Sequence, residues 1–160
     1  MSKIAIISDS HDNIPRIEQM LKMTEKENIK TIIHCGDVCT RETLKYLQQN
    51  FKGQIYLSIG NVDADHGINE ETKNVKIFPE FGEIEMEGLK IAFVHSPQEA
   101  KELANTQKYN FVFYGHTHKP WEEDINNCKI INPGTLAGLF TRSTFAILDT
   151  QTKKVELIIL

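Results

Sequence analysis

The alternation of short apolar runs with longer amphipathic stretches in the first sixty residues limits the fold more than any other feature. Three of the apolar runs are rich in β-branched residues and predict strands: residues 3–8, 31–35 and 54–59. Two stretches with helical apolar spacing separate them, over residues 14–28 and 40–49, and Asn13 and Thr40 are suitable N-caps. Strands that alternate with helices predict a parallel sheet with helices outside it.

The second half of the chain has a different pattern, dominated by hairpins. Apolar alternation around turn residues predicts three hairpins, over residues 83–94, 121–132 and 143–160. Ser96-Pro97 opens a helix that runs to about residue 107, and residues 110–114 form a further strand. We therefore expect an α/β protein in which a parallel sheet joins a second, more antiparallel sheet. With no linker or repeat, residues 1–160 are expected to form a single domain.

Composition excludes several functional classes. Hydrophobic residues make up 40% and charged residues 25% of the chain, as in ordinary globular proteins. A net charge of −4 without a cluster of Lys and Arg argues against nucleic acid as a partner. No apolar stretch approaches the ~20 residues of a membrane-spanning helix, and the N-terminus does not resemble a signal peptide. The odd count of three cysteines, Cys35, Cys39 and Cys128, fits a reducing compartment, and we expect a cytoplasmic protein in which Cys35 and Cys39 are ordinary buried or half-buried residues.

Asp, Asn or His residues follow the ends of five predicted strands. They are Asp9, His11, Asp37, Asn61, His95, His116 and His118. Ligands of open α/β sheets bind outside the carboxyl ends of the strands, so these side chains can converge. Oxygen and imidazole donors without thiolate suit divalent metals, and seven ligands suit two ions that share a carboxylate. His34, inside a strand, and His66, in a polar loop, are expected to be structural.

The same residues resemble the five ordered motifs of the calcineurin-like metallophosphoesterases. The motifs are D-x-H at 9–11, G-D at 36–37, G-N-x-D at 60–63, a single His at 95 and G-H-x-H at 115–118. The chain length and the INPGT segment at 131–135 are similar to the small prokaryotic YfcE-type phosphodiesterase branch, and this segment is expected near the site. The resemblance covers nearly the whole chain.

This resemblance implies a two-sheet β-sandwich flanked by helices, with a dinuclear metal centre. One ion would be held by Asp9, His11, Asp37 and His118, and the second by Asp37, Asn61, His95 and His116. A metal-bridging hydroxide would attack phosphorus in a small phosphoester substrate, most naturally a diester. Manganese is the first choice of metal, with Ni, Fe, Co, Mg and Zn as alternatives. Membrane partners are not expected, and self-association is left open.

Two positions depart from the family pattern. Many relatives carry His third in the GNHD motif, where it is thought to protonate the leaving group, and Val62 stands there in this chain. Ser96 replaces a frequent Gly, but it is a suitable N-cap before Pro97. The loss of a general acid predicts a preference for diesters or activated esters with good leaving groups. His66 is the nearest candidate for a replacement acid, and Asp63 is expected to cap the loop.

Two other functions remain as alternatives. A retromer subunit of similar fold acts as a scaffold, so the chain could be a catalytically weak or inactive metal-binding module. Some relatives are metal-dependent nucleases, although the basic surface that such activity would need is missing from the sequence. Lys119 and Arg142 are expected to be surface cations. The filled set of seven ligand positions favours an enzyme.

Overall fold

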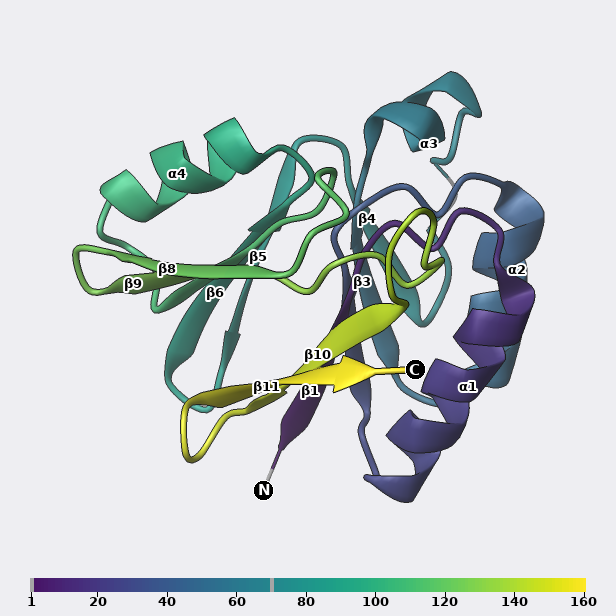
Figure 1. Cartoon of the computed structure of the whole chain (residues 1–160), viewed down its shortest axis with the longest axis horizontal. Helices are drawn as coiled ribbons and strands as arrows, with labels where there is room; N and C mark the ends of the chain where they lie inside the picture. Colours follow the sequence, from purple (N-terminus) through teal and green to yellow (C-terminus); the bar gives the residue numbers. More distant parts are fainter. Residues whose placement is uncertain (1, 70) are drawn as a thin grey trace.

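Two β-sheets form the centre of the molecule in the computed structural model, which describes residues 2–69 and 71–160. The strand order is β11-β10-β1-β2-β3-β4 in the six-stranded sheet and β5-β6-β7-β9-β8 in the five-stranded sheet. The two sheets pack face to face, with α1 and α2 outside the first and α4 outside the second (Figure 1). This layered α/β sandwich confirms the predicted fold class.

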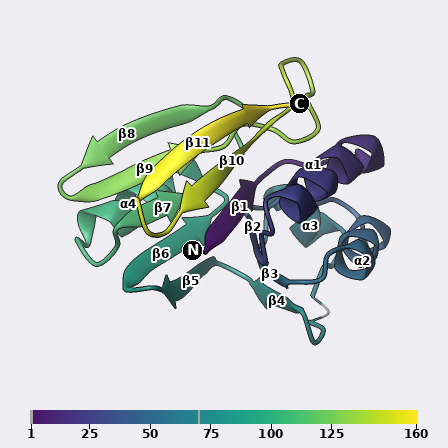
Figure 2. The same ribbon diagram turned by 90° about the horizontal axis from the view of Figure 1, so that it is seen from below.

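The six-stranded sheet has a parallel part and an antiparallel edge. Its parallel strands are β1 (Lys3–Ile7), β2 (Thr31–His34), β3 (Gln54–Ser58) and β4 (Val75–Phe78). The hairpin of β10 (Thr144–Asp149) and β11 (Lys154–Ile159) extends the sheet beyond β1, where β10 pairs antiparallel with β1 (Figure 2).

The five-stranded sheet is mixed. Its strands are β5 (Phe81–Met86), β6 (Leu89–Val94), β7 (Phe111–Phe113), β8 (Trp121–Ile125) and β9 (Cys128–Asn132). Hairpins join β5 to β6 and β8 to β9, whereas β7 runs parallel to both β6 and β9. Two parallel sheet segments therefore exist, one in each sheet.

Three of the helices begin at the caps that the sequence predicts. They are α1 (Ile14–Lys26), α2 (Arg41–Asn50) and α4 (Pro97–Asn105). Side chains of Asn13, Thr40 and Ser96 accept hydrogen bonds from the backbone N–H three residues later in each case. A fourth, short helix, α3 (Asn61–Asp65), begins directly after β3 and Gly60.

Side-chain alternation along the strands builds the core in three layers. Ile4 and Ile6 of β1 face Phe93 and Phe113 of the second sheet, and all four are fully buried. Intervening residues such as Ala5 pack toward α1 and α2, while the outer face of the second sheet packs against α4. Burial on both faces holds the parallel strands rigidly, which fixes the positions of the loops at their carboxyl ends.

The second sheet is the more antiparallel of the two, as expected, because the β5–β6 and β8–β9 hairpins contribute most of its strand pairing. Other expectations about the elements are wrong. The hairpin at residues 143–160 belongs to the first sheet and not to the second. The turn expected at residues 59–65 contains helix α3. The strand β4 has no counterpart among the predicted elements, although Val75 and Ile77 alternate with the exposed Lys76. Among the helices of the described residues, none is long and apolar enough to cross a membrane.

Candidate metal centre

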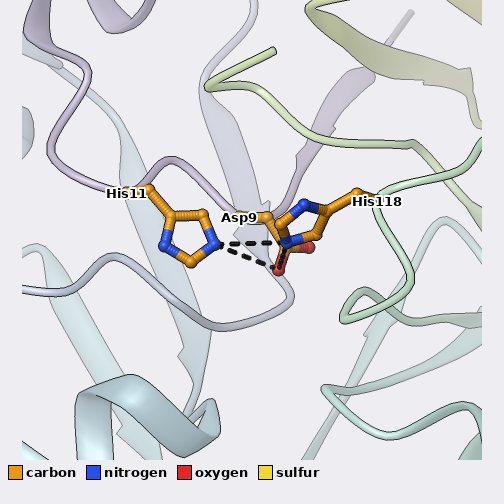
Figure 3. Close-up of side chains that lie close together, drawn as sticks. All are labelled: Asp9, His11 and His118. Atoms are coloured by element: carbon orange, nitrogen blue, oxygen red, sulfur yellow. Dashed lines mark hydrogen bonds and ion pairs between the residues drawn. The ribbon is translucent and has the colours of Figure 1, made fainter. Parts of the chain in front are cut away.

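Asp9, His11 and His118 form one compact group of candidate ligands, although 107 residues separate the two histidines. Asp9 and His11 lie in the loop after β1, and His118 lies in the loop after β7 (Figure 3). The Nε2 atoms of His118 and His11 are 3.1 and 3.6 Å from Asp9 Oδ1, and 3.3 Å from each other. Three donor atoms therefore converge on one point.

The two oxygens of Asp9 have different surroundings. Oδ2 accepts hydrogen bonds from the Ser8 hydroxyl at 2.6 Å and from the His116 backbone N–H at 3.0 Å. Oδ1 is buried and has no hydrogen-bond partner among the described residues, yet it faces both histidines. A buried carboxylate oxygen without a hydrogen bond is costly unless a cation satisfies it, so this atom marks a binding position for a cation.

Asp37, Asn61, His95 and His116 form a second group beside the first. His95 Nε2 lies 3.4 Å from Asp37 Oδ2 and 3.1 Å from Asn61 Oδ1. His116 Nδ1 lies 3.2 Å from both Asn61 Oδ1 and His95 Nε2. These side chains come from the ends of β2, β3, β6 and β7, so both sheets contribute.

Asp37 connects the two groups. Its Oδ2 lies 3.4 Å from His95 Nε2 and 3.9 Å from His11 Nε2. Its Oδ1 accepts a hydrogen bond from the Val62 backbone N–H, which orients the carboxylate. Donor atoms of Asp9, Asp37 and His95 also lie within 4.8 Å of one another. The geometry thus allows Asp37 to be shared between two ions.

The Nδ1 nitrogens of two candidate ligand histidines, His95 and His11, have polar partners outside the two groups. His95 Nδ1 donates to the Cys35 carbonyl at 2.7 Å, which leaves Nε2 as the nitrogen with a lone pair on the site. His11 Nδ1 lies 3.2 Å from the sulfur of Cys39. Such partners fix the tautomer and orientation of metal-binding histidines.

Backbone strain is concentrated at the candidate ligands. Five of them have positive φ angles, a left-handed conformation that is uncommon for residues other than glycine. The values are 51° for Asp9, 39° for His11, 59° for Asp37, 70° for His116 and 60° for His118. Strain of this kind persists where the surrounding structure imposes it, and it is typical of functional sites.

Two glycines permit the close approach of the loops. A Cβ atom at Gly115 would lie 1.9 Å from the Ser8 hydroxyl and 2.7 Å from Asp9 Oδ2. A Cβ atom at Gly60 would lie 2.2 Å from Asp37 Oδ1. Any side chain at either position would displace a carboxylate of the site.

The carboxylates and imidazoles of the site shift one another's pKa values. Burial alone would raise the pKa of Asp9 and Asp37, but hydrogen bonds and charges from neighbouring histidines outweigh it and lower both values. The Asp9 carboxylate beside it raises the pKa of His11, and Asp37 raises the pKa of His95 against the effect of burial. Two adjacent carboxylates thus stay ionised and attract positive charge.

The side chains of Asp63 and Asn132 are not among the predicted ligands, but they hold the loops that carry them. Asp63 Oδ1 accepts from the backbone N–H of Cys39, and Oδ2 accepts from those of Asp37 and Gly60. Asn132 donates to the Gly115 carbonyl, as befits a segment expected near the site. As expected, Asp63 caps its own loop through the Gly60 N–H, and it also accepts from the 37–39 loop, which is distant in sequence.

The INPGT segment also holds the loop after β1. Thr135 donates its hydroxyl to the Asp9 carbonyl at 2.9 Å, and the Ala137 backbone N–H donates to the same oxygen at 3.1 Å. The Leu136 backbone N–H donates to the Ser8 carbonyl. This segment therefore joins the loops that carry Asp9 and His118, which confirms its expected place near the site.

The remaining histidines and cations lie outside both groups. His34 is fully buried, donates through Nε2 to Ser10 and accepts from the Gly36 N–H, in agreement with its structural interpretation. His66 is exposed and donates through Nδ1 to the Val62 carbonyl at the end of α3. Lys119 and Arg142 are exposed, as expected.

The donor set fits divalent metal ions. Carboxylate, amide and imidazole donors converge without a thiolate, a chemistry typical of sites for Mn, Fe, Zn and related ions. The unpartnered Asp9 Oδ1 supports the same conclusion independently, since a cation would satisfy it.

Comparisons with known proteins agree with this chemistry. The family model of the calcineurin-like phosphoesterase superfamily domain matches residues 2–153. A phosphodiesterase of Methanocaldococcus jannaschii is 34% identical, with 99% of each chain aligned. A solved structure of a novel archaeal phosphodiesterase, also 34% identical, superposes with a TM-score of 0.85 over 99% of both chains.

More distant solved structures share the fold. The E. coli phosphoesterase Yfce is 18% identical and superposes with a TM-score of 0.69 over 98% of both chains. Vacuolar protein sorting 29 of Cryptosporidium parvum is 19% identical, with a TM-score of 0.71 over 99% of this chain and 96% of that one. Because the family model matches residues 2–153 and a phosphodiesterase is 34% identical over nearly the whole chain, the chain belongs to the calcineurin-like phosphoesterase superfamily and is a phosphoester hydrolase.

Proposed function

We propose that the chain is a dinuclear metal-dependent phosphodiesterase that acts on small phosphoesters, and that residues 1–160 form its single catalytic domain. The observation that carries the proposal is the buried Asp9 Oδ1, which has no hydrogen-bond partner among the described residues and faces two imidazole nitrogens. The 34% identity to a phosphodiesterase over 99% of the chain supports a diester as the substrate.

The proposed ligands divide between two ions. Asp9, His11 and His118 would hold one ion, and Asn61, His95 and His116 the other, with Asp37 shared. Bound divalent ions lower the pKa of a water, so that a nucleophile exists near neutral pH, and neutralise charge on the phosphoryl oxygens. Manganese is the ion that we propose first, because the donors are oxygen and imidazole nitrogen.

The protein positions the ligands before any ion arrives. The hydrogen bonds of Asp9 Oδ2 and Asp37 Oδ1 leave the second oxygen of each carboxylate directed at the histidines. The carbonyl of Cys35 keeps the Nδ1 proton on His95, so Nε2 is available. A preformed centre of this kind binds a phosphoryl group without a large rearrangement.

Replacement of ligands tests the proposal. His118→Ala and Asp37→Asn should each abolish manganese-dependent hydrolysis of bis(p-nitrophenyl) phosphate, because one removes an imidazole of the first group and the other the shared charge. Lys119→Ala, next to His118 but on the exposed surface, is the matched control and should keep wild-type activity. Retained activity in both ligand variants would rule out the proposed centre.

Protonation of the leaving group is a separate question. Val62 has no proton to offer, and both oxygens of Asp63 already accept backbone N–H groups. His66 is the candidate acid that remains: its Nδ1 proton is given to the Val62 carbonyl, so only its doubly protonated form, which also carries a proton on Nε2, could donate to a leaving group. We propose that the enzyme prefers esters with good leaving groups, which depend least on such a donor.

A series of esters with graded leaving-group pKa measures this preference. We expect kcat/KM to fall steeply as the leaving group becomes more basic, because little proton donation assists the step. A shallow dependence would mean that another acid acts, and His66→Ala would then steepen it if His66 is that acid. Lys73→Ala, on an exposed loop, is a suitable control.

The rival function is that of a metal-binding scaffold. A chain that keeps its fold and binds manganese but does not cleave esters would support the scaffold, whereas metal binding with hydrolysis supports the enzyme. Salt-sensitive DNA binding would point to a nuclease instead. A cytoplasmic location and self-association stay predictions from the sequence.

A further inference from the structure

We propose that Cys39 is a positioning residue of the metal centre, whose sulfur accepts the Nδ1 proton of His11 and turns Nε2 of that ring toward Asp9. The sulfur lies 3.2 Å from His11 Nδ1, while His11 Nε2 faces Asp9 Oδ1 at 3.6 Å. The inference rests on the proposed metal-dependent function, because the ring orientation matters only if Nε2 binds an ion.

His95 shows the same arrangement with an oxygen in place of sulfur. Its Nδ1 donates to the Cys35 carbonyl, and its Nε2 faces Asp37 Oδ2 at 3.4 Å. Each imidazole is thus held through the nitrogen that points away from the site. A neutral imidazole carries one proton, so a proton held on Nδ1 leaves the lone pair on Nε2.

The backbone of Cys39 is fixed independently of His11. Its N–H donates to Asp63 Oδ1 at 2.8 Å, and Asp63 Oδ2 holds the backbone N–H of Asp37 at 2.8 Å. One buried carboxylate therefore sets the positions of both the shared ligand and the sulfur. The sulfur belongs to a loop that is held by these hydrogen bonds, so it can restrain the orientation of the His11 imidazole.

The backbone conformation of Cys39 is uncommon for a residue with a side chain. Its φ is +80°, a left-handed value that Gly or Asn adopts more readily than Cys. The backbone at this position would therefore be easier to form without the thiol. The thiol is buried beside the His11 imidazole, where its sulfur can accept the Nδ1 proton in a weak hydrogen bond.

The test compares Cys39→Ala, Cys39→Ser and Cys128→Ala in the full chain. Cys128 is a second buried cysteine, on the face of the sheet covered by α4, and serves as the matched control. Manganese affinity is measured by calorimetry. The tautomer of His11 is read from nitrogen-15 shifts of its ring in metal-free protein, at a pH where the imidazole is neutral.

Removal of the sulfur should weaken manganese binding about 10- to 100-fold, as expected for loss of an outer hydrogen bond to a ligand histidine. It should also reduce the share of His11 that carries its proton on Nδ1. Cys39→Ser should restore part of both effects, because a hydroxyl also accepts, and Cys128→Ala should match the wild type. Melting temperatures of all variants show whether any effect reflects the fold instead.

The inference is overturned if Cys39→Ala binds manganese with wild-type affinity and leaves the His11 tautomer unchanged. Failure of the proposed function looks different. In that case wild-type protein would not hydrolyse the aryl diester, while the tautomer of His11 would still depend on Cys39.

Discussion

At the scale of single residues, the candidate ligands were predictable because each follows a strand end. Asp9, Asp37 and His118 needed only the strand predictions and the rule that ligands gather at carboxyl ends. The supporting contacts were not predictable in this way. The bond from Cys39 to His11 and those from Asp63 to the 37–39 loop join residues 24 and more positions apart, and no local pattern records them.

The structure gives Val62 a backbone role that the sequence did not indicate. Its side chain removes a proton donor, but its backbone N–H donates to Asp37 Oδ1 at 3.0 Å. The same residue therefore orients the Asp37 carboxylate through its backbone, while its side chain has no proton to offer in the proposed reaction. The hydrogen bond to Asp37 comes from the backbone, so it does not depend on which side chain stands at position 62.

His34 provides a prediction about pH. Burial lowers the pKa of His34 from 6.5 to about 4, so the unfolded chain takes up its proton first as the pH falls. This depressed pKa contributes stability that is present above about pH 6.5 and is lost as the pH falls toward 4. The loss has a slope of at most about 1.4 kcal/mol per pH unit.

The predicted loss of stability is checked by measuring the unfolding free energy of wild type and His34→Gln by chemical denaturation at several pH values. Gln can donate to Ser10 and accept from Gly36 as His34 does, yet it does not titrate. The variant should lose less unfolding free energy between pH 7 and pH 5 than the wild type. Equal losses in the two proteins would contradict the assignment of a neutral, buried His34.

At the scale of elements, the strongest periodic segments were predicted well and the shortest were not. The helix α3 has five residues and a Gly-Asn-x-Asp composition that is equally typical of a turn. Its position is set by Asp63, which bonds to the 37–39 loop far away in sequence. Strand β4 pairs in parallel with β3. Alternation of apolar and polar residues could indicate a strand there, but not the strand with which it pairs.

The segment after β9 is the element that should matter most to the site beyond the ligands. Asn132 donates to the Gly115 carbonyl at 3.0 Å and to the Thr117 hydroxyl at 2.9 Å, and accepts from the Gly134 N–H. Asn132→Ala should cost about 1–3 kcal/mol of unfolding free energy, because buried partners lose their hydrogen bonds. Manganese affinity should fall as well, because the loop that carries His116 and His118 loses its hydrogen bonds to Asn132.

Denaturation and calorimetry of the same variant separate the two effects. Asn105→Ala, at the exposed end of α4, is the matched control and should change neither quantity. A variant that is destabilised but binds manganese normally would show that Asn132 supports the fold alone.

At the scale of the whole molecule, the layered α/β class was predictable and the pairing of its edges was not. The hairpin of β10 and β11 joins the first sheet because β10 pairs with β1, from Lys3 opposite Asp149 to Ile6 opposite Ala146. Such pairing depends on which apolar faces meet across 140 residues, which local alternation does not encode. The sandwich matters for the proposed function because both sheets bring candidate ligands to one edge.

The central claim is that this edge holds two metal ions that share Asp37. Its most direct test counts manganese ions bound per chain by equilibrium titration of metal-free protein. Wild-type protein should bind two ions, and His118→Ala and Asn61→Ala should each keep one, because each removes a ligand of a different ion. One ion or none in the wild type, or two ions in both variants, would contradict the claim.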